Sequence, residues 1–194
     1  MKKTVILVLL LSLLLSCKKK AEAQTEQSLI TSIALLLFTA TGKPQGVEPV
    51  QNFQLEKYLG KWYEIARFDH SFERGLSHVT AEYSVIDTAN VKVLNKGYNE
   101  AKNTYETREG TAMFAADAST GHLKVSFFGP FYSSYIIIEL DADYQYSLVT
   151  GPDRNYLWIL ARNPTLDSAT LNKLLDKAKS LNYNTDNLIY VNQK

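Results

Sequence analysis

The stretch Val79-Thr80-Ala81-Glu82-Tyr83-Ser84-Val85 alternates apolar and polar side chains at every position. A repeat of two residues is typical of a β-strand with one buried and one wetter face. The same alternation returns in residues 122–128 and 144–148. The sequence predicts eight such strands, at about residues 61–69, 77–86, 90–98, 104–115, 122–128, 134–140, 144–150 and 156–162. Because only short turns separate them, we expect an all-β fold, either an antiparallel barrel or a sandwich.

A single helix is predicted after these strands. Asp167 follows Pro164-Thr165 and is a good N-cap residue. Beyond it, apolar residues recur at helical spacing, at Leu171, Leu174, Leu175, Ala178 and Leu181. We expect this stripe to pack on the wall of the β-structure rather than to bind lipid or a partner. Residues 187–192 are predicted to form a short final strand.

The first residues of the chain have the pattern of a secretory signal. Lys2 and Lys3 precede an apolar run at 4–15, and Ser16-Cys17 closes it. This order resembles a bacterial lipobox, in which the cysteine is lipidated. The alternative is an ordinary cleaved signal with an unmodified cysteine. We therefore predict a lipoprotein signal peptide at residues 1–16, a lipidated tether at 17–50 and a domain at 51–194.

Within this tether, the apolar segment from Leu29 to Phe38 is too short to span a bilayer as a helix. It could lie in the membrane interface or pack on the domain, and the sequence does not decide between them.

Composition and charge exclude several classes of function. Removal of residues 1–16 takes away two lysines and leaves a net charge of −1, which does not suit a nucleic-acid binder. Cys17 is the only cysteine, so no disulfide is expected. The chain has no Gly-x-Ser-x-Gly elbow and no glycine-rich phosphate loop. The three histidines, His70, His78 and His122, lack metal-ligand spacing, so neither a metal nor another cofactor is expected.

Three short motifs, in order, resemble the signature of the lipocalin family. They are Gly60-Lys61-Trp62, the block around Asp141, and Arg162-Asn163-Pro164. Residues 62–69, 125–132 and 151–154 look like the bacterial outer-membrane lipocalins, close to apolipoprotein D, and the resemblance spans about 53–193. It implies an eight-stranded antiparallel up-and-down lipocalin barrel with one C-terminal helix packed outside and a short final strand. Gly60, Trp62, Asp141 and Arg162 would be structural, with Trp62 plugging the closed end beneath Arg162.

A ligand would enter the open end of such a barrel. The loops there should be about 69–76, 98–103, 129–133 and 151–155. We expect Phe72 and Phe131 to form an apolar rim, and Arg74 and Arg154 either to meet an anionic head group or to be solvated loop charges. In one strand phase the inward, ligand-binding residues are Val79, Tyr83, Phe127, Tyr135, Ile137, Tyr146, Tyr156 and Trp158. A slip of one residue would turn the whole set outward.

Two functions follow from this resemblance. The first is a membrane-anchored carrier of fatty acids or lysophospholipids, for lipid storage or transport in the cell envelope, lipid-anchored at the outer membrane. The second is an envelope interaction or structural module whose barrel is filled by its own side chains. An enzyme is not expected, because the family's isomerase uses a cavity cysteine that this domain lacks. The sequence leaves a monomer and a homodimer both open.

Overall fold

The computed structural model describes five residues of the N-terminal segment and all of the domain, that is Lys20, Gln24, Thr25, Gln27, Ser28 and residues 42–194. The predicted lipidation site Cys17 and the apolar segment Leu29–Phe38 lie outside the described residues. The chain divides into two units, residues 1–39 and 40–194. Within the described residues, we find no helix with the length and apolar character needed to cross a membrane.

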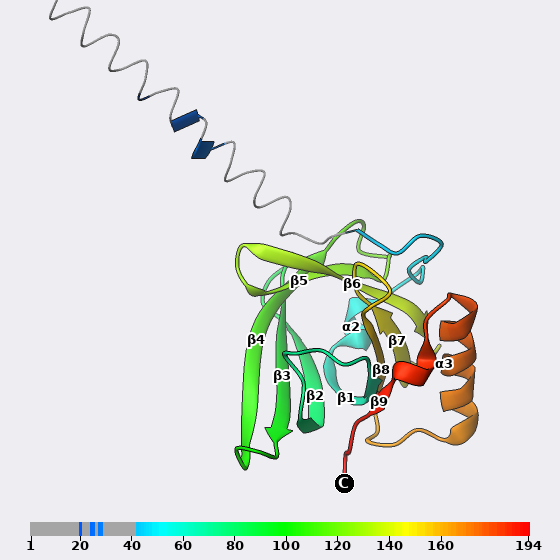
Figure 1. The fold of residues 1–194 in the computed structure, drawn as a ribbon. Helices are drawn as coiled ribbons and strands as arrows, with labels where there is room; N and C mark the ends of the chain where they lie inside the picture. The colour runs from blue at the N-terminus through cyan, green and yellow to red at the C-terminus, as the bar shows by residue number, and fades with distance from the viewer. Residues whose placement is uncertain (1–19, 21–23, 26, 29–41) are drawn as a thin grey trace, which may run out of the picture. The chain divides into compact units, whose positions relative to one another are not determined.

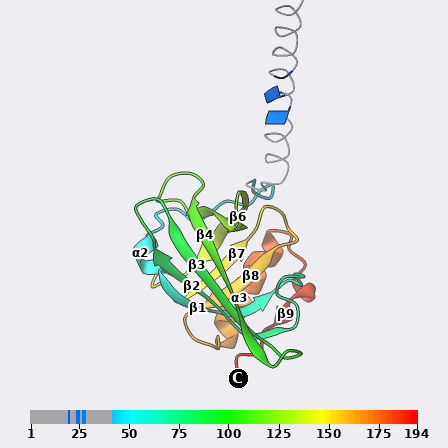
Figure 2. The ribbon, with the colours of Figure 1, turned by 90° about the vertical axis from the view of Figure 1, so that its left-hand side faces the viewer.

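Eight antiparallel strands form a closed barrel in the second unit (Figures 1 and 2). Each strand pairs with the next along the chain, and β1 pairs with both β2 and β8, which closes the sheet. The predicted barrel is therefore confirmed, with strand ends within a few residues of those expected. The strands are β1 (Gly60–Arg67), β2 (Leu76–Val85), β3 (Val91–Asn99), β4 (Thr104–Phe114), β5 (His122–Phe128), β6 (Phe131–Leu140), β7 (Tyr146–Thr150) and β8 (Leu157–Ala161).

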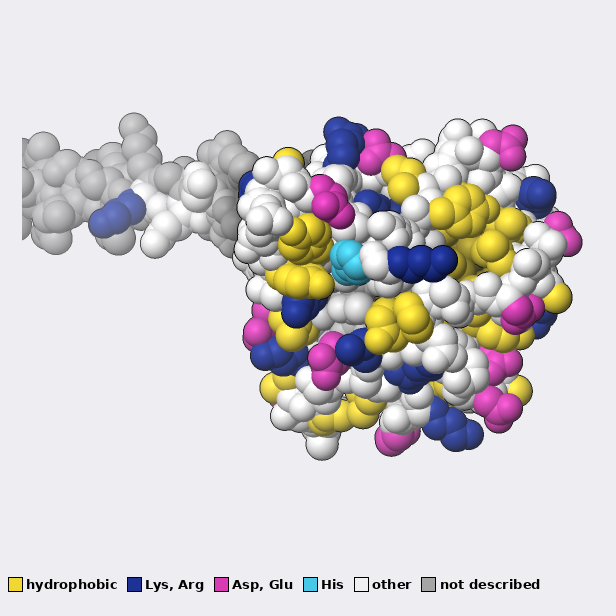
Figure 3. All heavy atoms as spheres, turned by 90° about the horizontal axis from the view of Figure 1, so that it is seen from below, with side chains coloured by type: hydrophobic (Ala, Val, Ile, Leu, Met, Phe, Trp, Pro, Cys, Tyr) yellow, Lys and Arg dark blue, Asp and Glu magenta, His cyan; other side chains and the backbone are white. Residues whose placement is uncertain are grey.

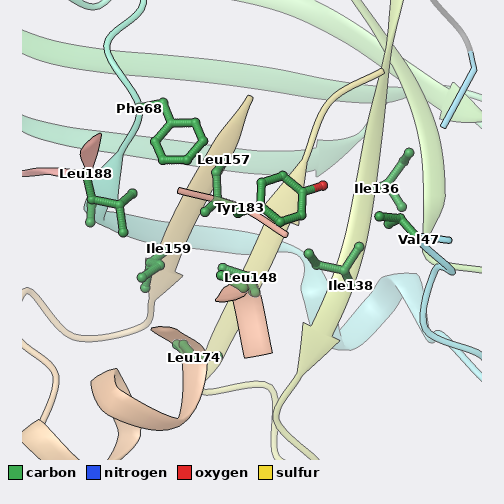
Figure 4. Close-up of a cluster of buried hydrophobic side chains, with 12 residues drawn as sticks. Val47, Phe68, Ile136, Ile138, Leu148, Leu157, Ile159, Leu174, Tyr183 and Leu188 are labelled. Atoms are coloured by element: carbon green, nitrogen blue, oxygen red, sulfur yellow. The ribbon is translucent and has the colours of Figure 1, made fainter. Parts of the chain in front are cut away.

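The helix α3 (Ser168–Ser180) packs against the outside of the barrel, as predicted. Its N-cap is Asp167, whose side chain accepts a hydrogen bond from the Thr170 amide. Leu174 and Ala178 are fully buried in a cluster of side chains between the helix and strands β6 to β8 (Figure 4). We call this group the wall cluster. It includes Ile136, Ile138, Leu148, Leu157 and Ile159.

A segment before the first strand also packs on the barrel. Val47 is fully buried in the wall cluster, and the backbone of Val50 exchanges hydrogen bonds with Ile137 and Gly121. Residues 44–50, which the sequence assigns to the tether, therefore contact the domain. A short helix that the sequence did not predict, α2 (Leu55–Tyr58), follows and leads into β1.

The chain ends in a 3-10 turn, η1 (Thr185–Asn187), and a two-residue strand, β9 (Ile189–Tyr190). The predicted final strand is present, although shorter than the expected 187–192. β9 pairs with β1 beyond the point where the pairing of β1 with β2 ends. Here the Gln193 side chain donates to the backbone oxygens of Glu64 and Val79, so the C-terminus joins these two strands.

Candidate functional site

One end of the barrel is closed around Trp62. Its ring is fully buried, and its indole N–H donates to the backbone oxygen of Tyr58 at 2.8 Å. The Arg162 guanidinium lies over the ring, 3.9 Å from the centroid. The same guanidinium donates to the backbone oxygens of Lys57, Leu59, Lys61 and Tyr144. Arg162 thus ties α2, β1 and the β6–β7 turn over the indole.

The other two signature residues hold the backbone at the same end. Gly60 has a φ of +86°, and a Cβ there would lie 3.6 Å from the Arg162 guanidinium. Such a backbone conformation favours glycine. Asp141 accepts hydrogen bonds from the amides of Asp143 and Gln145 and so shapes the β6–β7 turn.

The interior of the barrel is largely apolar and aromatic. We call its buried residues the interior cluster; they are Phe53, Tyr58, Trp62, Tyr83, Val91, Val93, Ala112, Leu123, Ile137, Tyr144, Val149 and Leu160. Tyr83 and Ile137, two of the predicted inward residues, belong to it. Three others, Phe127, Tyr135 and Trp158, are partly buried against it. Val79 is also buried, where β2 lies beside Gly97 of β3.

The prediction for Tyr146 is wrong. Its ring packs against the wall cluster outside the barrel, and its hydroxyl accepts a hydrogen bond from Lys173 of α3. The adjacent Ser147 and Val149 pair instead with inward residues of β6 and β8. The physical reason is that β7 is covered on both sides, so its sequence does not distinguish the helix-covered face from the interior.

Three tyrosine hydroxyls meet in the interior. The Tyr135 hydroxyl lies 2.7 Å from that of Tyr58 and accepts a hydrogen bond from Tyr83 at 2.8 Å. Burial raises the pKa of Tyr58 to about 12 and raises the pKa of Tyr83 and Tyr135 well above the usual value. All three are therefore neutral phenols near pH 7, able to donate and accept hydrogen bonds.

A charged cluster, which the sequence did not predict, lies on the interior wall beside Trp158. Arg67 and Glu64 of β1 are only 2% and 4% exposed, and the guanidinium donates to Glu64 Oε1 at 2.6 Å. A second guanidinium nitrogen donates to the backbone oxygen of Glu73, in the β1–β2 loop. The Glu73 carboxylate accepts a hydrogen bond from the Trp158 indole at 3.1 Å. Glu64, Arg67, Glu73 and Trp158 form what we call the charged cluster.

The ionisation of this cluster is strongly perturbed. Burial, reinforced by the neighbouring Glu73, raises the pKa of Glu64 to about 8, although Arg67 opposes the shift. Burial also raises the pKa of Glu73. Two buried carboxyl groups thus lie near one guanidinium, which donates to the carboxylate of Glu64 and to the backbone oxygen of Glu73.

An aromatic stack stands beside the charged cluster. The buried His70 ring lies between the rings of Phe72 and Tyr156, with centroid separations of 5.2 and 4.9 Å. The centroid of the Trp158 ring is also 4.9 Å from that of His70. Burial, and then the charge of Arg67, lowers the pKa of His70, so this imidazole is neutral near pH 7. Tyr156 precedes β8 and belongs to this stack rather than to the strand wall.

Aromatic side chains are exposed in the β1–β2 loop and at the β5–β6 hairpin. Phe72 is 52% exposed, and Phe131 is 44% exposed beside Phe128 at 70%. Figure 3 views the domain from the end that carries the β3–β4 hairpin and shows hydrophobic patches between basic and acidic side chains. Arg74 is exposed and forms a bidentate pair with Asp69.

The structure gives Arg154 a different role from the head-group contact predicted for it. Its guanidinium donates to the backbone oxygens of Leu181, at the end of α3, and of Gln45. It also lies 5.9 Å from the Tyr183 ring centroid. Arg154 is thus neither a solvated loop charge nor free for a ligand, because it joins the β7–β8 loop to the helix and the N-terminal segment.

Glu64, Arg67 and Glu73 were not predicted from the sequence as site residues. One signal was available, because Glu64 shares the face of Trp62 two residues away, and a carboxylate on a buried face is unusual. Arg67 gave no such signal, since it turns inward only through an irregularity between Glu64 and Ala66. Within the described part of the chain, no three His, Cys, Asp or Glu side chains converge to hold a metal ion.

Comparison with known proteins agrees with this architecture. Residues 53–193 match the lipocalin-like domain family. The chain is 50% identical over 162 residues to the outer membrane lipoprotein Blc of Vibrio cholerae. The aligned region covers 83% of this chain and 95% of the relative. It is 37% identical over 154 residues to apolipoprotein D of Bos taurus, and that alignment covers 75% of this chain and 80% of the relative.

Solved structures show the same fold at low sequence identity. Insecticyanin from the tobacco hornworm superimposes with a TM-score of 0.62 at 21% identity, covering 78% of this chain and 86% of that one. The closed barrel, the Trp62–Arg162 plug, the outer helix and the family match lead to one conclusion: the chain belongs to the lipocalin family.

Proposed function

We propose that this protein is a membrane-anchored carrier that holds a fatty acid or a lysophospholipid inside its barrel, for lipid storage or transport in the cell envelope. The observation that carries the proposal is the aromatic interior, closed at one end by Trp62 and bordered at the other by exposed aromatic loop residues. An apolar interior suits an acyl chain, and a few polar groups within it suit the polar end.

The proposed location is the outer membrane, through a lipid on Cys17. Support comes from the lipobox-like sequence and from relatives named outer membrane lipoprotein. A tether would hold the barrel beside its source of lipid, which raises the effective concentration of ligand without any new contact.

The anchor is tested by expressing the chain with its own signal and comparing the wild type with Cys17→Ser. We expect the wild type in the membrane fraction and the variant in the soluble fraction. A Ser16→Ala variant, which leaves the cysteine in place, is the matched control. If Cys17→Ser stays with the membranes, the anchor proposal is wrong.

The alternative function is an envelope module with a filled barrel. It is favoured by the dense packing of Phe53, Tyr58 and Trp62, whose rings occupy the closed end of the interior. Under this alternative the whole interior would be protein side chains, and a protein partner would replace the lipid. Neither function requires catalysis, and we propose none.

A lipid titration separates these functions. Residues 17–194 carrying Cys17→Ser would be delipidated under denaturing conditions, refolded and titrated with oleate and an oleoyl lysophospholipid. The chain has two tryptophans, and Trp158 lies near the mouth loops while Trp62 is sealed in the closed end. Saturable one-to-one binding that changes tryptophan fluorescence supports the carrier.

Trp158→Phe is the control for this readout. It should remove most of the fluorescence change while calorimetry still detects binding. If neither lipid binds by either method, the carrier proposal fails and the filled barrel becomes the working function.

A further inference from the structure

The hydrogen bonds of the charged cluster leave part of its guanidinium unused. The Arg67 guanidinium uses one terminal nitrogen on Glu64 and the other on the backbone oxygens of Glu73 and Leu76. Glu64 accepts from Arg67 at Oε1, and Glu73 accepts from the Trp158 indole at Oε2. Buried carboxylates are ordinarily fully paired, because an unpaired charge in a dry site is costly.

Two buried nitrogen atoms beside these carboxyl groups lack a hydrogen-bond partner. Among the described residues, Arg67 Nε and His70 Nε2 are buried and make no hydrogen bond. Arg67 is 2% exposed and His70 6% exposed. Native proteins rarely leave a buried guanidinium N–H unpaired, and such an atom calls for an explanation, such as a ligand that completes the site. Nitrogen atoms without a hydrogen-bond partner thus lie beside two buried carboxyl groups on one stretch of the interior wall.

We propose that the charged cluster is the subsite for the polar end of the barrel's ligand, and that it admits a carboxylate only together with a proton. This inference rests on the proposed carrier function and specifies the chemistry of its site. A hydroxyl end would bind without a proton, accepting from Arg67 Nε and donating to a carboxylate. An ester end, which has no hydrogen to donate, would only accept from Arg67 Nε.

The net charge of the cluster decides which ligand ends it can hold. The groups that face the cluster are Glu64 and Arg67 from β1, His70 and Glu73 from the β1–β2 loop, and Tyr83 from β2, while β8 contributes the neutral indole of Trp158. With His70 and Tyr83 neutral, one guanidinium balances one carboxylate, and the raised pKa of Glu64 is consistent with a proton held by the pair.

A ligand carboxylate would add an uncompensated negative charge to this balanced site. Charges in a poorly hydrated interior repel strongly, so the second glutamate should take up a proton as the ligand enters. The proton comes from solvent, and no bond is made or broken in the ligand. Binding of a carboxylate should then weaken as the pH rises, by up to about tenfold per pH unit for one proton taken up.

The test compares decanoate, which is ionised throughout, with decanol between pH 6.5 and 9, using the Cys17→Ser chain from residue 17. We expect decanoate affinity to fall steeply with pH and decanol affinity to stay level. Calorimetry in buffers of different ionisation enthalpy should detect uptake of about one proton with decanoate and none with decanol. A decanoate affinity that is independent of pH, with no proton uptake, overturns the proposal.

Variants show where the proton goes. In Glu64→Gln/Glu73→Gln the lone guanidinium can take the carboxylate directly, so decanoate should bind without pH dependence. The control, Glu82→Gln/Glu109→Gln, removes two exposed carboxylates from the outer faces of β2 and β4 and should behave as the wild type. If the pH dependence survives in the first variant, the ligand itself takes the proton elsewhere in the barrel, and the proposal is wrong.

A second variant covers the case in which the double substitution does not fold. Arg67→Gln removes the positive charge but keeps an amide that can donate to a hydroxyl, so the variant should lose decanoate and keep decanol. Equal loss of both ligands would contradict the assignment. Absence of binding by the wild type, for both ligands at every pH, would instead refute the carrier function itself.

Discussion

The most demanding prediction concerns the plug at the closed end of the barrel. Trp62→Ala removes a fully buried ring that packs on Tyr58, with 4.6 Å between centroids, and beneath Arg162. It also leaves the Tyr58 backbone oxygen without its indole donor. Because the surrounding side chains belong to three different elements, the cavity cannot collapse by moving one of them.

The magnitude follows from three contributions. Truncation of a buried Trp to Ala costs about 3–5 kcal/mol, the lost hydrogen bond about 1 kcal/mol, and the cation–π contact roughly 0.5–2 kcal/mol. These terms overlap, so we expect a loss of about 5 kcal/mol in the free energy of unfolding. In a domain of this size that lowers Tm by roughly 15 °C. Trp62→Phe keeps a ring but loses the hydrogen bond, and should cost about 2 kcal/mol.

The assay is thermal and urea denaturation followed by circular dichroism, on the Cys17→Ser chain from residue 17. Phe128→Ala, which removes an aromatic ring that is 70% exposed, is the matched control and should shift Tm far less. The reasoning would be refuted if Trp62→Ala melted within about 3 °C of the wild type. A larger loss of stability in Trp62→Phe than in Trp62→Ala would also refute it.

Three further predictions test other parts of the structure. Burial raises the pKa of Glu64 from 4.5 to about 8, so between these pH values the folded state holds a proton that the unfolded state has released. The free energy of unfolding should therefore fall as the pH rises from about 4.5 to 8. Glu64→Gln should flatten this part of a profile of urea midpoint against pH. Gly110→Ala should lower the free energy of unfolding by about 1–3 kcal/mol, because a Cβ there would lie 2.8 Å from the Phe127 ring and 2.7 Å from the Ser126 backbone oxygen. An unchanged urea midpoint would contradict this packing. Asp167→Ala should cost about 1 kcal/mol by removing the N-cap of α3, whereas Asp176→Ala, on the same helix but away from the cap, should change the midpoint much less.

Much of the fold could be predicted from local sequence because its signals are local. Period-two alternation marked the eight strands, and the Asp167 cap with its apolar stripe marked α3. The short helix α2 had no such signal, since four residues are too few to show helical periodicity. It forms where the chain turns over the Trp62 plug, which is a tertiary requirement.

The candidate site was less accessible to sequence reasoning. Most of the residues assigned to the interior do lie there, but Tyr146 lies outside, because β7 is apolar on both faces. Arg154 looked like a loop charge, and only the fold brings it to the carbonyls of Leu181 and Gln45. Both outcomes depend on contacts between residues far apart in the chain.

The sequence by itself determined the order of the strands, the capped helix and the signature residues that identify the family, because alternation, capping and short motifs are written in neighbouring residues. The tertiary structure alone decided what the barrel wall offers a ligand. An irregularity in β1 turns Arg67 inward beside Glu64, and the β1–β2 loop brings Glu73 against both. Burial then perturbs their protonation, a property that belongs to the assembled interior and not to any stretch of sequence.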